Sequence, residues 1–164
     1  MNFTDEKDYI MRMIKEMVRV LFSLAFGKKY VSVELEKENK YEVSGKNLKI
    51  FLNMIDLGQI NEAENILLDS IDYTNKNEVM AVALFYQYLS EKDNQFLENN
   101  NYTKEEVLSG FKQLLMKSGY RDLLYLKYLR RTCAGDYSRG GCLCGYIADF
   151  QKRNILLADW CIKR

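Results

Sequence analysis

The chain has 164 residues, the size of a single domain, and its 48% hydrophobic and 29% charged residues are typical of a soluble globular protein. It contains no proline, so nothing removes a backbone donor from a helix, and this composition favours helices. It also contains no histidine, which excludes the commonest general base and the commonest metal ligand. We therefore expect an all-α protein that is not an enzyme and carries no cofactor.

The formal net charge is only +1, but the charges are unevenly distributed. Residues 1–116 carry 14 Lys and Arg against 19 Asp and Glu, whereas residues 117–164 carry 10 against 4. A basic C-terminal segment can bind an anionic partner. It can also pack on the acidic body of its own chain or remain solvated, and the sequence leaves these interpretations open.

No stretch reaches the ~18–20 apolar residues that a membrane span requires. Asp5, Glu6 and Asp8 lie where a signal peptide would carry positive charge, and the apolar run 20–26 is short. We therefore expect a cytoplasmic protein with no membrane segment. In that compartment its four cysteines would be free thiols.

The spacing of apolar residues predicts a long amphipathic helix over residues 5–26, with a period of about 3.6. Gly27, followed by two lysines, is a stop signal. Val20, Phe22 and Phe26 widen the apolar face beyond one side of the helix. Such a helix either runs through the core or pairs with a second copy of the chain, so a homodimer through this helix is an alternative.

Residues 30–46 are ambiguous, because Val31, Val33 and Leu35 alternate as in a strand while no partner strand is evident. A short helix or an extended linker is expected here, ending at Ser44 and Gly45.

Two amphipathic helices are predicted on either side of Gly58, over residues 48–55 and 60–71. Their apolar faces comprise Leu48, Phe51, Leu52 and Ile55, and then Ile60, Ala63, Ile66, Leu67 and Ile71. Asn61 and Glu64 are spaced as in a capping arrangement. A hairpin of this kind buries one face and offers the other for contact.

Further helices are predicted over residues 78–97, from Thr103 to Ser118, over 120–131 and over 147–162. Thr103 and Glu106 have the spacing of a capping box. Four glycines between residues 132 and 145 indicate a loop. We expect a helical domain over residues 1–131, with residues 132–164 as a basic, Gly- and Cys-containing segment packed on it or appended to it.

The segment from Leu57 to Glu64 resembles the middle of a tetratricopeptide repeat, where a Leu-Gly pair closes the first helix and a small Ala lets the helices approach. The first-helix Trp and terminal Pro of that pattern are missing. A second copy is expected ~34 residues downstream. The nearest candidate, at residues 101–105, lies at a spacing of about 40 residues and has no equivalent Ala, so a second copy is degraded at best. The resemblance implies a tetratricopeptide-like fold of six or seven helices in antiparallel hairpins.

Residues 5–117 also resemble a family of small helical bacterial proteins of unknown function. The matching pieces are residues 8–12, 60–65, 85–86 and 104–107. This resemblance implies an α-helical, repeat-like fold and brings no catalytic motif with it. It does not cover the chain beyond about Gly119.

The four cysteines all lie in the basic C-terminal segment, at Cys133, Cys142, Cys144 and Cys161. Four thiolates can hold zinc tetrahedrally, so a metal-binding regulator is an alternative. Their spacing gives one Cys-x-Cys and two single cysteines instead of two Cys-x-x-Cys pairs. Cysteines acting as small apolar side chains are favoured, and no metal site is predicted.

Basic residues alternate with tyrosines at the start of this segment. The residues proposed to contact an anionic partner are Arg121, Lys127, Arg130, Arg131 and Arg139. Aromatic stacking with cations is one way to hold single-stranded nucleic acid, so nucleic-acid binding is a further alternative. The same pattern fits a packed helix. The function predicted from the sequence is a non-catalytic protein-interaction or scaffold module whose partner is a protein.

Overall fold

The computed structural model describes residues 3–27 and 41–125. Within these ranges the chain forms six α-helices, one two-stranded hairpin and one 3₁₀ helix, which confirms the expected all-α class. The elements are α1 (Phe3–Phe26), β1 (Glu42–Val43), β2 (Lys46–Asn47), α2 (Leu48–Asp56), α3 (Ile60–Ser70), α4 (Lys76–Glu91), α5 (Asn94–Asn99), α6 (Lys104–Lys117) and η2 (Arg121–Tyr125).

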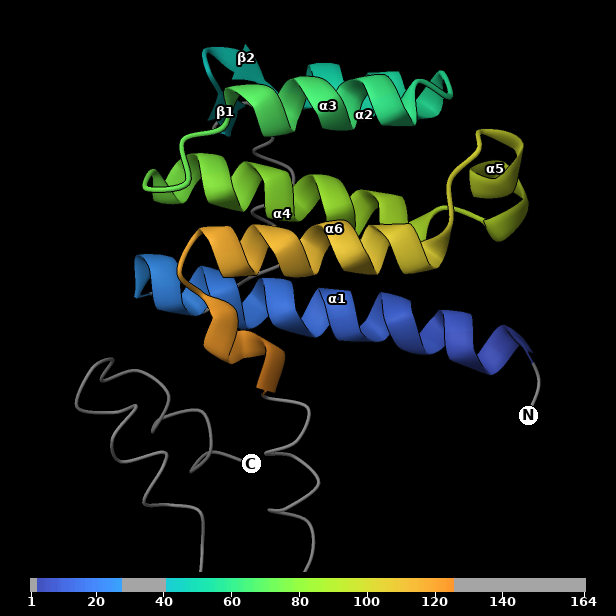
Figure 1. Cartoon of the computed structure of the whole chain (residues 1–164), viewed down its shortest axis with the longest axis horizontal. Helices are drawn as coiled ribbons and strands as arrows, with labels where there is room; N and C mark the ends of the chain where they lie inside the picture. The colour runs from blue at the N-terminus through green and yellow to red at the C-terminus, as the bar shows by residue number, and fades with distance from the viewer. Residues whose placement is uncertain (1–2, 28–40, 126–164) are drawn as a thin grey trace, which may run out of the picture.

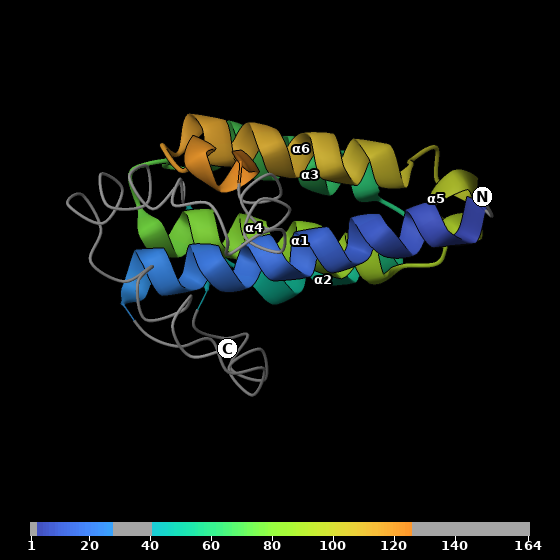
Figure 2. The ribbon, with the colours of Figure 1, turned by 90° about the horizontal axis from the view of Figure 1, so that it is seen from below.

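The long helices lie side by side along the longest axis of the molecule (Figure 1). The hairpin of α2 and α3 forms the top level in this view, α4 and then α6 follow in the centre, and α1 lies at the bottom. In the view from below, α1 lies in front of α4, and α6 runs alongside them (Figure 2). Helix α4 packs against α1, α6, α2 and β1 and so occupies the centre.

Helix α4 is buried on nearly all sides. Every residue from Val79 to Gln87 is buried, as are Leu89 and Ser90. A helix that is apolar all round is a core helix, because each of its faces needs a neighbour. The sequence pattern of this helix predicts six inward positions, and all six are buried, as are Met80 and Leu84; the six are Val79, Val82, Ala83, Phe85, Tyr86 and Leu89. The centre of the core is therefore built around a single helix.

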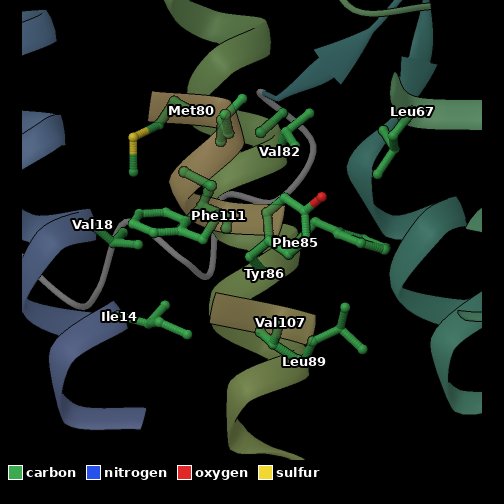
Figure 3. Packing of buried hydrophobic residues seen from close by; sticks show 14 of the residues in the cluster. Ile14, Val18, Leu67, Met80, Val82, Phe85, Tyr86, Leu89, Val107 and Phe111 are labelled. Atoms are coloured by element: carbon green, nitrogen blue, oxygen red, sulfur yellow. The ribbon is translucent and has the colours of Figure 1, made fainter. Parts of the chain in front are cut away.

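Helix α1 uses its apolar face inside the chain. Ile14, Val18 and Leu21 are fully buried against α4 and α6. In Figure 3, Ile14 and Val18 face Phe111 of α6 and the central helix. The expectation that this helix runs through the core is confirmed. A homodimer through α1 would have to use its outer face and stays a prediction.

The hairpin of α2 and α3 has the expected position and turn. The Asn47 side chain caps α2 by accepting a hydrogen bond of 2.8 Å from the Lys49 amide. Gly58 takes the left-handed conformation at the turn, with φ of 81°. The expected cap at Asn61 is wrong: the N-cap is Gln59, whose side chain makes no capping bond, and Asn61 lies inside α3. The tetratricopeptide likeness stays an interpretation.

Residues 42–47 form a β-hairpin, so the helix or extended linker expected up to Gly45 is wrong for this part. Val43 pairs with Lys46 across a turn in which both Ser44 and Gly45 have positive φ. That conformation is the one that a two-residue hairpin loop requires. The strand-like pattern at residues 31–35 lies outside the described residues.

The helix expected over residues 78–97 is two helices. Helix α4 ends at Glu91, and α5 begins after Asp93, whose side chain accepts a hydrogen bond from the Gln95 amide. Lys92 and Asp93 both take an extended conformation, because Asp93 satisfies a backbone donor of the next helix instead of continuing the first. The apolar pattern of residues 78–97 therefore continues across the boundary between α4 and α5, which is why a single helix was expected.

The cap of α6 is confirmed, since Thr103 Oγ1 accepts a hydrogen bond of 3.2 Å from the Glu106 amide. After Gly119 the expected α-helix is wrong as far as Tyr125, where the chain forms the 3₁₀ helix η2. Leu123 of η2 is buried, and the element packs against α6 and α1. The rest of that expected helix, the helix over 147–162 and the segment 132–164 lie outside the described residues.

Candidate functional site

One side of α2 exposes large apolar side chains. Leu57 is 76% exposed and Ile50 is 51% exposed. They are seven residues apart, which is two helical turns, and Met54 lies between them on the same side, partly buried against the core. Single exposed apolar residues are ordinary, but an i, i+4, i+7 row is how a helix presents anchors to a protein partner. We call Ile50, Met54 and Leu57 the hairpin outer face.

The opposite side of α2 borders a groove with a volume of about 230 Å³. Its apolar floor is formed by Leu48 and Leu52 of α2 and Leu84 of α4. Two tyrosines, Tyr41 and Tyr88, and two polar side chains, Gln87 and Glu91, complete the lining. The groove thus combines an apolar floor with a small number of polar groups, which is the usual composition of a binding site.

An ion pair lies beside this groove, where α2 ends close to α4. Lys92 Nζ lies 2.6 Å from Asp56 Oδ1, and Tyr88 Oη donates a hydrogen bond of 3.0 Å to the same carboxylate. The hydrogen bond from Lys92 is the main cause that lowers the pKa of Asp56 below its ordinary value of 3.8. The Lys92 ammonium also lies 4.3 Å from the centre of the Tyr88 ring. This cluster ties α2 to the end of α4.

A second polar cluster lies inside the molecule. Tyr86 Oη donates a hydrogen bond of 2.7 Å to Glu64, and the Tyr86 ring packs edge-on against Phe111 of α6. Burial, together with the nearby charge of Glu64, raises the pKa of Tyr86 and of Tyr102 above the ordinary value of 10.0. Both phenols therefore remain protonated at neutral pH. The hydrogen bond between Tyr86 and Glu64 joins α4 to α3 as a structural contact.

Of the residues proposed from the sequence to contact an anionic partner, only Arg121 lies within the part of the chain that the structure describes. Arg121 is exposed at the first position of η2. Lys127, Arg130, Arg131 and Arg139 lie outside the described residues, as do all four cysteines. Among residues 3–27 and 41–125, no three metal-ligating side chains come together. None of the helices described is both long and apolar enough to cross a bilayer.

The groove was missed in the sequence, although a signal for it was present. Gln87 interrupts the apolar run from Val79 to Leu89, and a polar residue at the centre of a buried helix needs a structural or functional reason. Tyr41 could not have been placed, because it reaches the groove only through the β-hairpin. Long-range pairing of that kind leaves no local pattern in a sequence.

Comparison with known proteins gives one match. No curated protein and no solved structure matches the chain. A model described as a family of unknown function, DUF6483, matches residues 4–119. This confirms the expected resemblance of residues 5–117 to a family of unknown function and leaves the basic C-terminal segment outside the match. The described domain from α1 to α6 is thus the part that the family shares, and the chain belongs to DUF6483, a family of unknown function.

Proposed function

We propose that this protein is a non-catalytic protein-interaction module that binds its partner through the hairpin outer face. The exposure of Leu57 carries the proposal, because 76% of a large apolar side chain faces solvent at the tip of a well-formed hairpin. Ile50, which is 51% exposed, extends the same surface along α2. Met54 lies between Ile50 and Leu57 and is partly buried against the core, so it supports this surface from below. Burying a side chain such as Leu or Ile against a partner contributes about 1.5–3 kcal/mol.

The position of this surface in the fold supports the proposal. Leu48, Phe51 and Ile55 anchor the other side of α2 in the core, so the hairpin outer face is held on a rigid helix. A rigid surface loses little conformational entropy when it binds. We further propose that the protein acts in the cytoplasm, where its free cysteines would remain reduced.

Site-specific photo-crosslinking of the full chain tests this function. A photo-reactive residue at position 50 should capture a protein partner, while the same residue at the exposed Lys112 position of α6 should not. A second change, Leu57→Lys, should abolish the capture because it places a charge in the apolar contact. The matched control Gln113→Lys adds the same charge on α6 and should leave the capture intact.

Capture of equal yield from positions 50 and 112 would contradict the proposal, and so would capture that survives Leu57→Lys. Circular dichroism of each variant shows whether the helices are retained. A crosslinked species of twice the mass of the chain would identify a second copy as the partner.

A further inference from the structure

The groove between α2 and α4 has the size of a side-chain pocket. Its volume of about 230 Å³ is below the ~300–1,000 Å³ of sites that enclose drug-sized ligands. An apolar side chain of a protein partner, with the backbone around it, is a better match. Such pockets hold the anchor residues that dominate protein interfaces. The floor of Leu48, Leu52 and Leu84 is suited to an aliphatic or aromatic side chain.

Gln87 gives the groove a polar side chain. The residue is only 8% exposed and lines the groove. Among residues 3–27 and 41–125, the hydrogen bond of Gln87 to another side chain is made by its backbone oxygen, which accepts from Ser90 Oγ, and not by its carboxamide. The buried side-chain atoms without a partner in that part of the chain are Tyr73 Oη and Asn94 Oδ1, so the Gln87 carboxamide is accessible at the groove and not sealed in the core. A primary amide offers both a donor and an acceptor, which is the complement of a peptide group.

The charge balance of residues 41–116 favours a basic partner. Residues 41–116, which include both helices of the groove, carry 6 lysines and no arginine against 12 Asp and Glu. Glu91 is the charged residue in the lining, and its pairing with Lys15 at 3.1 Å is half exposed and therefore weak. An incoming cation can replace Lys15 at little cost. The acidic surface also attracts a basic segment over a distance of about 10 Å.

We propose that the groove binds an extended peptide segment that carries an apolar side chain next to a lysine or arginine. The apolar side chain occupies the floor, the Gln87 carboxamide bonds the peptide backbone, and the basic side chain pairs with Glu91. The groove lies across α2 from the hairpin outer face, since Leu48 and Ile50 are 200° apart around the helix at about 100° per residue. The two surfaces can therefore act independently.

Nuclear magnetic resonance titration of the full chain tests the proposal. The probe is a capped hexapeptide with one leucine between two lysines and glycine elsewhere. Its addition at low salt should shift the carboxamide signal of Gln87 and the methyl signals of Leu48, Leu52 and Leu84. Peptides with serine in place of the leucine, or with glutamate in place of both lysines, should bind at least about tenfold more weakly.

Gln87→Met separates a binding role from a structural one, because a structural amide is needed for stability and a binding amide is not. Methionine has a similar shape and no amide, so the variant should weaken peptide binding about tenfold and change the Tm by less than about 2 °C. Gln113→Met, at an exposed position of α6, should change neither quantity. Lys15→Gln releases Glu91 and should tighten peptide binding, whereas Glu91→Gln should weaken it.

Equal binding of the leucine and serine peptides would overturn the inference. A fall in the Tm of Gln87→Met with unchanged peptide affinity would also overturn it, since the amide would then be structural. If the Gln87→Met change shifts signals of residues 126–164 while the peptide shifts none in the groove, the occupant is the chain's own C-terminal segment and the proposal is wrong. Leu57→Lys should leave the titration unchanged, so failure of the hairpin outer face and failure of the groove are distinguishable.

Discussion

Tyr86 of α4 donates a hydrogen bond of 2.7 Å to Glu64 of α3, which lies 22 residues earlier in the chain. The bond joins the hairpin level of the molecule to the central level, and the Tyr86 ring packs on Phe85 and Phe111 at the same place. A hydrogen bond from a phenol to a carboxylate replaces a bond to water, and it is stronger than a bond between two neutral groups. This one residue therefore combines core packing with the polar link between α3 and α4.

Tyr86→Phe should lower the free energy of unfolding by about 1.5–3 kcal/mol at pH 7, because a hydrogen bond to a charged group is lost. Urea denaturation followed by circular dichroism measures the change. Tyr125→Phe, at an exposed position of η2, is the control and should have little effect. A loss of the same size in both variants would show that the bond to Glu64 is not the cause.

The pH dependence of stability should reveal the same contact. Burial raises the pKa of Tyr86 and Tyr102 in the folded state above the ordinary value of 10.0. Above pH 10 the unfolded chain loses these protons while the folded chain keeps them, so the free energy of unfolding falls as the pH rises. Denaturation between pH 9 and about 11 should show this fall in the wild type and a smaller one in Tyr86→Phe. An equal slope in both proteins would contradict the assignment.

Gly110→Ala should destabilise the protein although alanine is the better helix former. An added Cβ would lie 2.6 Å from Cε1 and 2.6 Å from Oη of Tyr86, and an aromatic ring in a packed core has little room to move. We expect a net loss of about 1–3 kcal/mol, measured by urea denaturation. The neighbouring exposed position supplies the control, since Ser109→Ala should be neutral or slightly stabilising. A gain in stability for Gly110→Ala would show that α4 and α6 separate more easily than the packing implies.

Gly58→Ala should cost more than Gly119→Ala, although both glycines have a φ above 80°. An alanine at position 119 would meet nothing within 4 Å, so its expected cost of about 1–2 kcal/mol is backbone strain alone. An alanine at position 58 would also collide with Asn100 Oδ1, and Asn100 is held by its own hydrogen bond of 2.7 Å to the Phe96 carbonyl. The difference between the two Tm values measures that collision. Equal losses would mean that the loop after α5 moves away freely.

Lys104→Met should destabilise the junction between α4 and α6. The Lys104 side chain is buried, and its ammonium donates a hydrogen bond to the backbone oxygen of Ser90 near the C-terminal end of α4. A cation there compensates the unpaired carbonyl groups of a helix end, so its removal should cost about 1–3 kcal/mol. Lys112→Met, on the exposed side of α6, should cost much less. Chemical denaturation of the two variants, compared at pH 7, decides the point.

Helix positions were predictable where the local pattern was complete. Residues 48–56 and 60–70 form the hairpin expected around Gly58, and Thr103 caps the expected helix. The break after Glu91 was not predicted, because Leu89 and Leu97 continue one apolar pattern across it. The pairing of Val43 with Lys46 was also missed, although two neighbouring turn-forming residues, Ser44 and Gly45, could have indicated it.

The sequence by itself determined the helical class, the position of α1 to α3 and most of the buried face of α2 and α3, because these follow from spacing within a few turns. Only the tertiary structure decided that α4 is buried on nearly all sides, that Glu64 pairs with Tyr86, and that Tyr41 and Gln87 meet at one groove. Those relationships join elements that are distant in the chain. Several helices have similar apolar faces, so local spacing does not say which helix packs against which. The packing of the whole core decides that arrangement.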